Sequence, residues 1–238
     1  MNIYEIHEPS ELIRGNSYVG RGIITGLSEN GKKAVCAYFI MGRSENSRNR
    51  VFAVENGELF TRPYDESKVK DPSLIIYAAL RQYENRLIVT NGNQTDTVYE
   101  GFEAGKSFAE ALSERAFEPD APNFTPRISA VMNLGKKLTY SMSILKSMDE
   151  VGSMCARYTF DYAALPGLGH FLHTYVCDGS PIPSFQGEPE RVRIADDIDA
   201  FTDGLWDALD SDNKISLYTR YIDLSDGTYT ERLINKNR

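Results

Sequence analysis

The first third of the chain contains two pairs of β-forming runs, and an Asn-Gly dipeptide separates the members of each pair. Residues 18–27 and 32–41 flank Asn30-Gly31, and residues 50–54 and 58–62 flank Asn56-Gly57. Asn and Gly both tolerate the positive φ that a tight hairpin turn requires. The pattern therefore predicts antiparallel sheet from the start of the chain, which excludes an all-helical fold.

The next segment, residues 73–83 (SLIIYAALRQY), is ambiguous between helix and strand. The spacing of Leu74, Ala78 and Arg81, together with two alanines, favours a helix. A strand is expected to follow at residues 86–90 (RLIVT).

Two consecutive helices are expected between this strand and residue 117. Thr97 with Glu100, and Ser107 with Glu110, have the spacing of capping boxes, and Gly105 lies between them as a helix stop.

The second half of the chain returns to strands. It predicts strands at residues 126–133, 137–146, 154–162 and 170–178, an amphipathic helix at 196–210, and a strand pair at 214–224 and 228–235. Residues 179–189 are rich in Pro and Gly, but Ile182 and Phe185 could pack, so an ordered loop is expected. Strands and helices cluster rather than alternate, which indicates an α+β class with about eight to ten strands in two stacked, mainly antiparallel sheets flanked by helices.

Composition limits the classes of partner. The chain has 34 acidic and 26 basic residues, a formal charge of −8, and neither a signal peptide pattern nor an apolar run long enough to span a bilayer. We expect a cytoplasmic protein that does not bind nucleic acid or membranes, with residues 1–238 as a single domain and 1–16 as its leading segment. Its three cysteines are widely spaced, which indicates free thiols rather than disulfides or a zinc site.

An arginine-rich loop stands out against this acidic background. In residues 42–50 (GRSENSRNR), three guanidinium groups are interspersed with neutral donors: the residues are Arg43, Arg48, Asn49 and Arg50, with Ser44, Asn46 and Ser47. Planar guanidinium groups suit a phosphate or a carboxylate. The alternative is a solvated loop between hairpins, which composition alone favours.

Two further loops have anion-binding or acid-base character. Residues 90–97 (TNGNQTDT) lie between a strand end and a helix start, where free backbone N–H groups favour an anion, although the same residues could form only a turn and a cap. Residues 117–129 contain Glu118, Asp120 and Arg127. A carboxylate near arginines stays charged as a base or an orienting acceptor, and the alternative is a structural ion pair.

Other catalytic motifs are absent from the sequence. There is no Walker loop, dinucleotide fingerprint, nucleophile elbow or CxxC pair. His170 and His173 would point to opposite faces of a strand, so a metal pair is not expected.

The order of these motifs resembles the archaeal-type IMP cyclohydrolase family. The resemblance rests on Gly20-Arg21 in the first strand, the loop from Arg43 to Arg50, Tyr77 within IIYAAL, the segment NGNQTDT and the sequence TPRI, which together span residues 18–133. It implies a four-layer αββα sandwich like that of the Ntn hydrolases. It also implies a purine ribonucleotide substrate, since the family closes the ring of 5-formamidoimidazole-4-carboxamide ribonucleotide (FAICAR) to IMP with release of water. That reaction is the last step of de novo purine synthesis, and the family needs neither metal nor organic cofactor.

The resemblance also implies roles for individual residues. Arg43 would polarise the formyl oxygen, Tyr77 would donate or relay a proton there, and Glu118 would orient or deprotonate the carboxamide. The implied substrate contacts are Arg21, Arg48, Asn49, Arg50, Asn91, Gly92, Thr95, Asp96 and Arg127. For Tyr77 the alternative is a buried helix tyrosine with a satisfied hydroxyl.

The sequence departs from the family and from its fold class in two places. The arginine loop is about two residues longer than the archaeal form, which leaves open whether Arg43, Arg48 or Arg50 faces the formyl group. The chain begins Met-Asn, without the terminal nucleophile of amide-cleaving Ntn hydrolases. A regulatory nucleotide-binding protein and, less favoured, an Ntn-type amide hydrolase stay as alternatives, and a homo-oligomer is possible.

Overall fold

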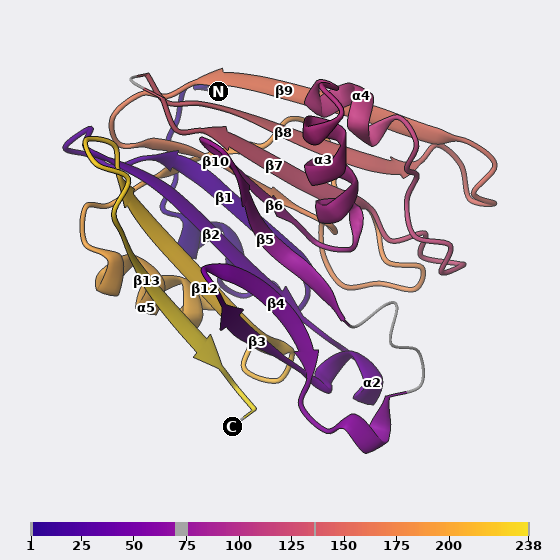
Figure 1. Cartoon of the computed structure of the whole chain (residues 1–238). Coiled ribbons are helices and arrows are strands. Elements are labelled where there is room, and N and C mark those ends of the chain that lie inside the picture. Colours follow the sequence, from indigo (N-terminus) through magenta and orange to yellow (C-terminus); the bar gives the residue numbers. More distant parts are fainter. Residues whose placement is uncertain (1, 70–75, 136, 238) are drawn as a thin grey trace.

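The computed structural model describes residues 2–69, 76–135 and 137–237, and in these residues the strands form two sheets stacked face to face (Figure 1). The order of the six-stranded sheet is β11-β10-β1-β2-β12-β13, and that of the seven-stranded sheet is β3-β4-β5-β6-β7-β8-β9. Neighbouring strands pair antiparallel throughout both sheets.

The bounds of the elements are as follows. The six-stranded sheet contains β1 (Arg21–Leu27), β2 (Lys33–Met41), β10 (Leu168–His173), β11 (Glu190–Arg193), β12 (Lys214–Asp223) and β13 (Tyr229–Asn235). The seven-stranded sheet contains β3 (Arg50–Glu55), β4 (Glu58–Pro63), β5 (Tyr77–Tyr83), β6 (Arg86–Thr90), β7 (Arg127–Asn133), β8 (Thr139–Ser147) and β9 (Cys155–Ala163). The helices are α1 (Pro9–Ile13), α2 (Glu45–Arg48), α3 (Gln94–Glu103), α4 (Phe108–Leu112), α5 (Ile198–Ala208) and the 3₁₀ turn η1 (Glu66–Lys68).

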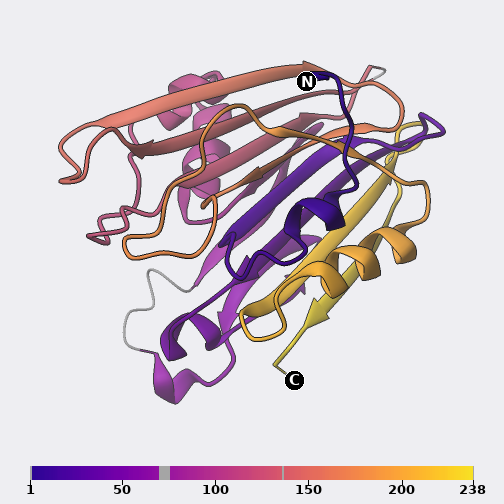
Figure 2. The ribbon, with the colours of Figure 1, turned by 180° about the vertical axis from the view of Figure 1, so that it is seen from behind.

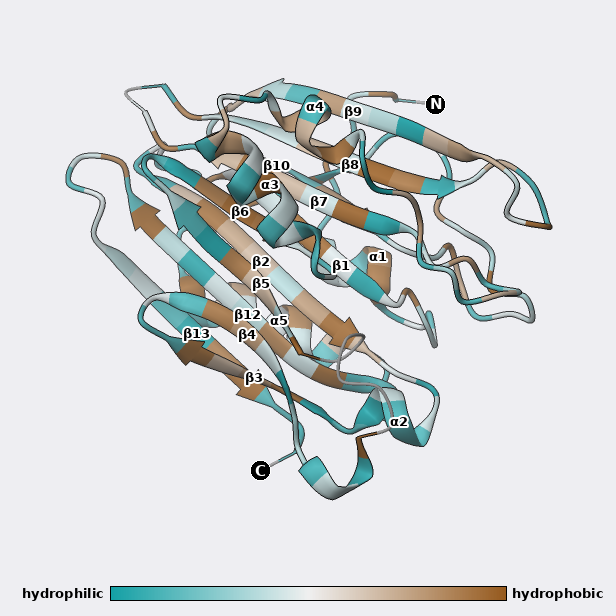
Figure 3. Cartoon of the chain, turned by 45° about the vertical axis from the view of Figure 1, so that its right-hand side comes forward, coloured by the Kyte–Doolittle hydropathy of each residue, from teal (hydrophilic) through white to brown (hydrophobic). Residues whose placement is uncertain are grey.

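The main core lies between the two sheets. Ile23 and Tyr38 of the six-stranded sheet share one buried apolar cluster with Leu80 and Val89 of the seven-stranded sheet. The hydropathy colouring shows hydrophobic segments along the strands of both sheets, whereas α2 is hydrophilic (Figure 3). Burial of these inner faces is the main force that holds the sheets together.

Helices cover the two outer faces. On the six-stranded sheet, α1 and α5 lie against the outer face (Figure 2). Ile13 of α1 and Leu205 of α5 pack there with Ile24 and Phe39, the outward neighbours of Ile23 and Tyr38. On the seven-stranded sheet, α3 and α4 pack against β6 and β7 (Figure 1). The predicted α+β sandwich of two stacked sheets flanked by helices is therefore confirmed. In the described part of the chain, no helix is both long and apolar enough to cross a membrane.

Both predicted Asn-Gly hairpins are confirmed. Strand β1 pairs with β2 across Gly31 (φ 71°), and β3 pairs with β4 across Asn56 (φ 52°) and Gly57 (φ 80°). The second turn has the predicted positive φ at both residues, whereas in the first only Gly31 has it, because that turn is longer and the Gly31 N–H donates to the Ser28 carbonyl at 2.9 Å.

The helix predicted at residues 73–83 is wrong for the described part of that segment, and residues 73–75 lie outside the described residues. Residues 77–83 form β5, which pairs with β4 and β6. Tyr77, Ala78, Ala79 and Leu80 are all buried, because the main core covers one face of β5 and α3 contacts the strand. A strand buried on both faces lacks the polar alternation that identifies a strand from sequence.

One of the two predicted capping boxes is present. Ser107 and Glu110 cap α4 reciprocally, and Gly105 (φ 76°) lies just after α3 as predicted. The box at Thr97 is wrong, because α3 begins earlier, at Gln94. The Thr97 hydroxyl instead accepts a hydrogen bond of 2.7 Å from Arg115 Nε.

Three short elements and one loop complete the comparison. The sequence patterns did not predict α1, α2 or β11, each of five residues or fewer. Ile182 and Phe185 are buried, so they anchor the loop between residues 179 and 189 as expected.

Candidate functional site

A pocket of about 280 Å³ lies where the first residues of β1 and β3 meet three loops. Its lining consists of Tyr18, Arg21, Arg43, Ser44, Asn46, Ser47, Arg50, Glu118, Asp120, Asn123, Thr125, Tyr175 and Ile182. Segments far apart in the sequence therefore form one polar pocket, and it includes four of the predicted site residues.

Two of the lining arginines are buried, and among the described residues their Nε atoms have no acceptor. Arg21 and Arg50 begin β1 and β3 and are only 9% and 6% exposed. Within the described residues the Nε atom of each has no hydrogen-bond partner, and the same holds for Arg127 at the start of β7. Buried donors of this kind are costly unless a ligand satisfies them.

Burial and neighbouring charges shift the pKa values of the three arginines in different directions. Burial opposes the charge of Arg21, but Tyr18 and Glu118 outweigh it, so the pKa of Arg21 lies above its ordinary value. Burial, reinforced by repulsion from Arg21, lowers the pKa of Arg50. Burial also lowers the pKa of Arg127, although Glu118 opposes that shift. The site thus concentrates positive charge that is only partly neutralised.

Glu118 stands beside Arg127 at the back of the pocket. Its Oε1 lies 3.9 Å from Arg127 Nη1, and its backbone N–H donates to the Thr125 carbonyl at 2.9 Å. Arg127 Nη1 also donates to Gln94 Oε1 at 2.8 Å. Gly92 leaves room for this group, since a Cβ there would lie 2.7 Å from Arg127 Nη1.

Tyr77 adjoins the buried arginines from the seven-stranded sheet. It begins β5, is 5% exposed, and its hydroxyl lies 3.0 Å from the hydroxyl of Tyr38 on β2. Its proximity influences the pKa values of Arg21 and Arg50. Tyr77 therefore lies within electrostatic range of Arg21 and Arg50, on a strand rather than the expected helix, although its side chain is not among those that line the pocket.

Arg43 lies at the rim of the pocket. Its Nη1 pairs with Asp178 and donates to the Gly179 carbonyl at 2.9 Å, and its guanidinium lies 5.1 Å from the centre of the Tyr18 ring. Its side chain is 35% exposed. The predicted catalytic arginine is thus more solvated than Arg21 and Arg50.

The sequence patterns missed an aromatic wall and the network behind it. The rings of Tyr18 and Tyr175 stack with centroids 5.8 Å apart. The Tyr175 hydroxyl lies 2.6 Å from Thr125 Oγ1, and Asp120 accepts hydrogen bonds from the backbone and side chain of Thr125. No local pattern signals this arrangement, because its members are up to 157 residues apart (175 minus 18).

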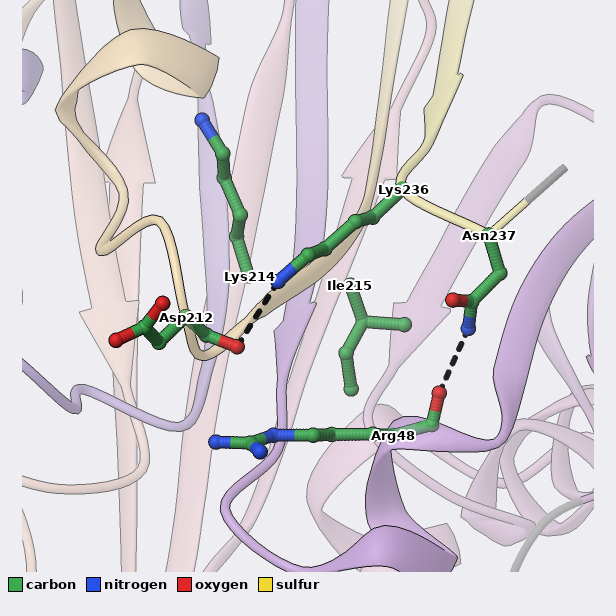
Figure 4. A pocket seen from close by; sticks show the side chains of 6 residues that line it. All are labelled: Arg48, Asp212, Lys214, Ile215, Lys236 and Asn237. Atoms are coloured by element: carbon green, nitrogen blue, oxygen red, sulfur yellow. Dashed lines mark hydrogen bonds between the residues drawn. The ribbon is translucent and has the colours of Figure 1, made fainter.

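Arg48 points away from this pocket. It lines a separate cavity of about 380 Å³ with Asp212, Lys214, Ile215, Lys236 and Asn237 (Figure 4). Its guanidinium donates to the Gly42 carbonyl and to Asn213 Oδ1. Since Arg48 is in α2 and Arg50 starts β3, the chain turns between them and separates their side chains.

Four other predicted substrate contacts are bonded to protein groups. Asn49 exchanges hydrogen bonds with the backbone of Asp65, and Asn91 bridges Pro126, Ile128 and Gln94. Thr95 bonds to Thr90, and Asp96 pairs with Arg81. Their role as substrate contacts stays a prediction, and their side chains are not among those that line the pocket.

The arrangement suits an anionic ligand that also carries hydrogen-bond acceptors. Guanidinium groups without acceptors bind phosphate or carbonyl oxygens, and the tyrosine wall offers apolar faces to a planar ring. Tyr77 can donate a proton, and Glu118 can accept one. Among the described residues, no group of three or more His, Cys, Asp or Glu side chains is placed to hold a metal ion.

Comparison with known proteins adds a separate line of observation. Residues 18–227 match the model of a family described as IMP cyclohydrolase-like protein. An IMP cyclohydrolase of Methanopyrus kandleri is 30% identical to this chain over 184 residues, which cover 71% of the chain and 89% of that protein. An IMP cyclohydrolase of Methanococcus aeolicus is 26% identical over 164 residues, covering 67% and 75% respectively. The matched region contains the whole pocket lining.

Proposed function

The chain belongs to the IMP cyclohydrolase-like protein family, and from this premise we propose that it closes the ring of FAICAR to form IMP and water. The observation that supports this function best is that the buried Nε atoms of Arg21, Arg50 and Arg127 have no hydrogen-bond partner among the described residues. FAICAR offers a phosphate, a formyl oxygen and a carboxamide oxygen, which are the acceptors that such donors lack.

The geometry favours one orientation of the substrate. Arg21 and Arg50 are buried next to Tyr77, so they would face the formyl and carboxamide oxygens. The phosphate would lie at the rim, where Arg43 is partly solvated. This orientation leaves the most strongly hydrated group of the substrate near water, which lowers the cost of its desolvation.

The proposed reaction has two stages. The carboxamide nitrogen attacks the formyl carbon, one of its protons passes to Glu118, and the guanidinium groups stabilise the charge that develops on the formyl oxygen. In the second stage the proton held by Glu118 passes to this oxygen, the C–O bond breaks, and the resulting hydroxyl group leaves as water with a second proton from Tyr77. The formamido nitrogen loses its proton as the C=N bond forms. The pocket residues thus supply positioning, charge stabilisation and proton transfer.

The test is to mix the purified chain with FAICAR in the presence of a chelator and to follow the absorbance of IMP. Tyr77→Phe, Glu118→Gln and Arg50→Gln should each lower kcat, the last by about 100-fold. Arg43→Gln should mainly raise KM, which would place Arg43 at the phosphate. Arg62→Gln is the matched control, because Arg62 pairs with Glu55 on the β3–β4 hairpin and is not among the lining residues.

Two outcomes would contradict the proposal. Normal turnover in the Arg50, Tyr77 and Glu118 variants would remove these residues from the mechanism. IMP binding without turnover by the wild-type chain would assign it instead to a regulatory nucleotide-binding protein. The relation to Ntn hydrolases, the single domain, the cytoplasmic location and a homo-oligomer stay predictions.

A further inference from the structure

The hydroxyl groups of Tyr38 and Tyr77 form an isolated buried pair. Their oxygens are 3.0 Å apart, and neither has another hydrogen-bond partner among the described residues. Tyr38 comes from the middle of β2 and Tyr77 from the start of β5, so the pair joins the two sheets. Tyr38 is fully buried, whereas Tyr77 is 5% exposed.

The surroundings decide which hydroxyl donates. The charged groups that act on Tyr38 are Arg21 and Arg50, and guanidinium groups carry donors but no acceptor. If Tyr77 donated to Tyr38, the proton of Tyr38 would be buried without an acceptor, which is unfavourable. If Tyr38 donates to Tyr77, the proton of Tyr38 has an acceptor in the Tyr77 oxygen, and the proton of Tyr77 is available to a ligand.

Packing holds Tyr38 in this geometry. Its ring stacks on Phe52 with centroids 5.3 Å apart, and its backbone lies between Ile23 of β1 and Tyr218 of β12. Burial, the largest influence, raises the pKa of Tyr38 well above its ordinary value, although Arg21 and Arg50 oppose that shift. Tyr38 therefore keeps its proton and acts as a fixed donor.

We infer that Tyr38 is a positioning residue, which donates its hydroxyl proton to Tyr77 and thereby turns the proton of Tyr77 toward the substrate. This inference rests on the proposed function. During loss of water, the oxygen already carries the proton that Glu118 returned; the C–O bond breaks, its electron pair stays on the oxygen, and that oxygen takes a second proton from Tyr77. The hydrogen bond from Tyr38 stabilises the phenolate left behind. The proton that leaves the formamido nitrogen then restores Tyr77.

The test is the variant Tyr38→Phe, which keeps the ring and removes only the donor. We expect kcat for IMP formation to fall about tenfold with KM unchanged, because orientation acts on the chemical step. In the background of Tyr77→Phe, the same substitution should have no further effect on kcat, since its target is gone. Tyr140→Phe is the control: this tyrosine is as deeply buried as Tyr38, but its hydroxyl bonds to His170 Nδ1 at 2.7 Å rather than to Tyr77, so removal of that hydroxyl should leave kcat unchanged.

The possible results distinguish failure of the role inferred for Tyr38 from failure of the proposed function. Wild-type kcat in Tyr38→Phe, or equal losses from that substitution in the presence and absence of the Tyr77 hydroxyl, would overturn the inference alone. A wild-type chain without turnover would overturn the proposed function, and this inference with it.

Discussion

Gly92 offers a way to disturb the site without disturbing the fold. A Cβ at this position would lie 2.7 Å from Arg127 Nη1, 2.7 Å from Gln94 Oε1 and 3.6 Å from Glu118 Oε1. Gly92 is not one of the glycines with a positive φ, so its backbone can accept alanine. The two closest atoms are ends of flexible side chains, and they must move apart in Gly92→Ala.

The expected cost can be divided between stability and activity. Losing the 2.8 Å hydrogen bond from Arg127 to Gln94 costs about 1.5–3 kcal/mol, and the reduced freedom of the unfolded chain returns about 0.4–1 kcal/mol. The net loss of unfolding free energy should therefore be about 0.5–2.5 kcal/mol, which leaves the chain folded. A displacement of about 1 Å at Arg127, beside Glu118, should lower kcat/KM for IMP formation by 10-fold to about 100-fold.

Thermal unfolding and initial rates of IMP formation would measure the two quantities. Gly204→Ala is the control: no atom lies within 4 Å of the added Cβ, and the position is inside α5. It should raise stability by about 0.5–1 kcal/mol and leave kcat/KM unchanged. A Gly92→Ala protein with wild-type kcat/KM would refute the view that the position of Arg127 matters. Global unfolding of Gly92→Ala would refute the view that this substitution disturbs the site while the chain stays folded.

Three further predictions concern other parts of the chain. Arg48→Gln should leave kcat/KM within about twofold of wild type in the IMP assay, because its guanidinium is bonded to Gly42 and Asn213 rather than to the pocket; a larger fall would return Arg48 to the site. Arg220→Ala should lower the free energy of urea unfolding by about 1–3 kcal/mol, since Arg220 is 1% exposed and its removal leaves the Gly57 carbonyl without this donor; a loss below about 0.5 kcal/mol would contradict this account. Burial, reinforced by the charge of Arg191, lowers the pKa of His170 to about 4. The neutral ring of His170 therefore contributes its full stability above the unfolded pKa of about 6.5, and this contribution is lost as the pH falls toward about 4. In His170→Gln the unfolding temperature should fall less between these two pH values than in the wild-type chain. An equal fall in both proteins would show that other groups cause it.

The sequence predicts those parts of the fold that local chemistry determines. The Asn30-Gly31 and Asn56-Gly57 turns, the Ser107 cap and most strand positions are correct, because positive φ, capping and side-chain alternation act within a few residues. The helix predicted around Tyr77 to Leu80 is wrong for the opposite reason. Its strand conformation depends on partners in β4 and β6 and on burial of both faces, which the segment itself does not encode.

The pocket could be predicted in part. Arg21, Arg43, Arg50 and Glu118 line it as a resemblance of motif order suggested. The direction of each side chain could not be predicted, because Arg48 and Arg50 are two residues apart and yet diverge where α2 ends and β3 begins. The wall of Tyr18 and Tyr175 forms only through long-range packing, and a single chain gives no local sign of it.

The most direct test of the account is the rate at which IMP appears when the wild-type chain and Arg50→Gln are mixed separately with FAICAR, with chelator present. The account predicts that the wild-type chain converts FAICAR to IMP and that Arg50→Gln, with unchanged thermal unfolding, is slower by about 100-fold. A wild-type rate no greater than that of FAICAR alone, or equal rates for the two proteins, would contradict it.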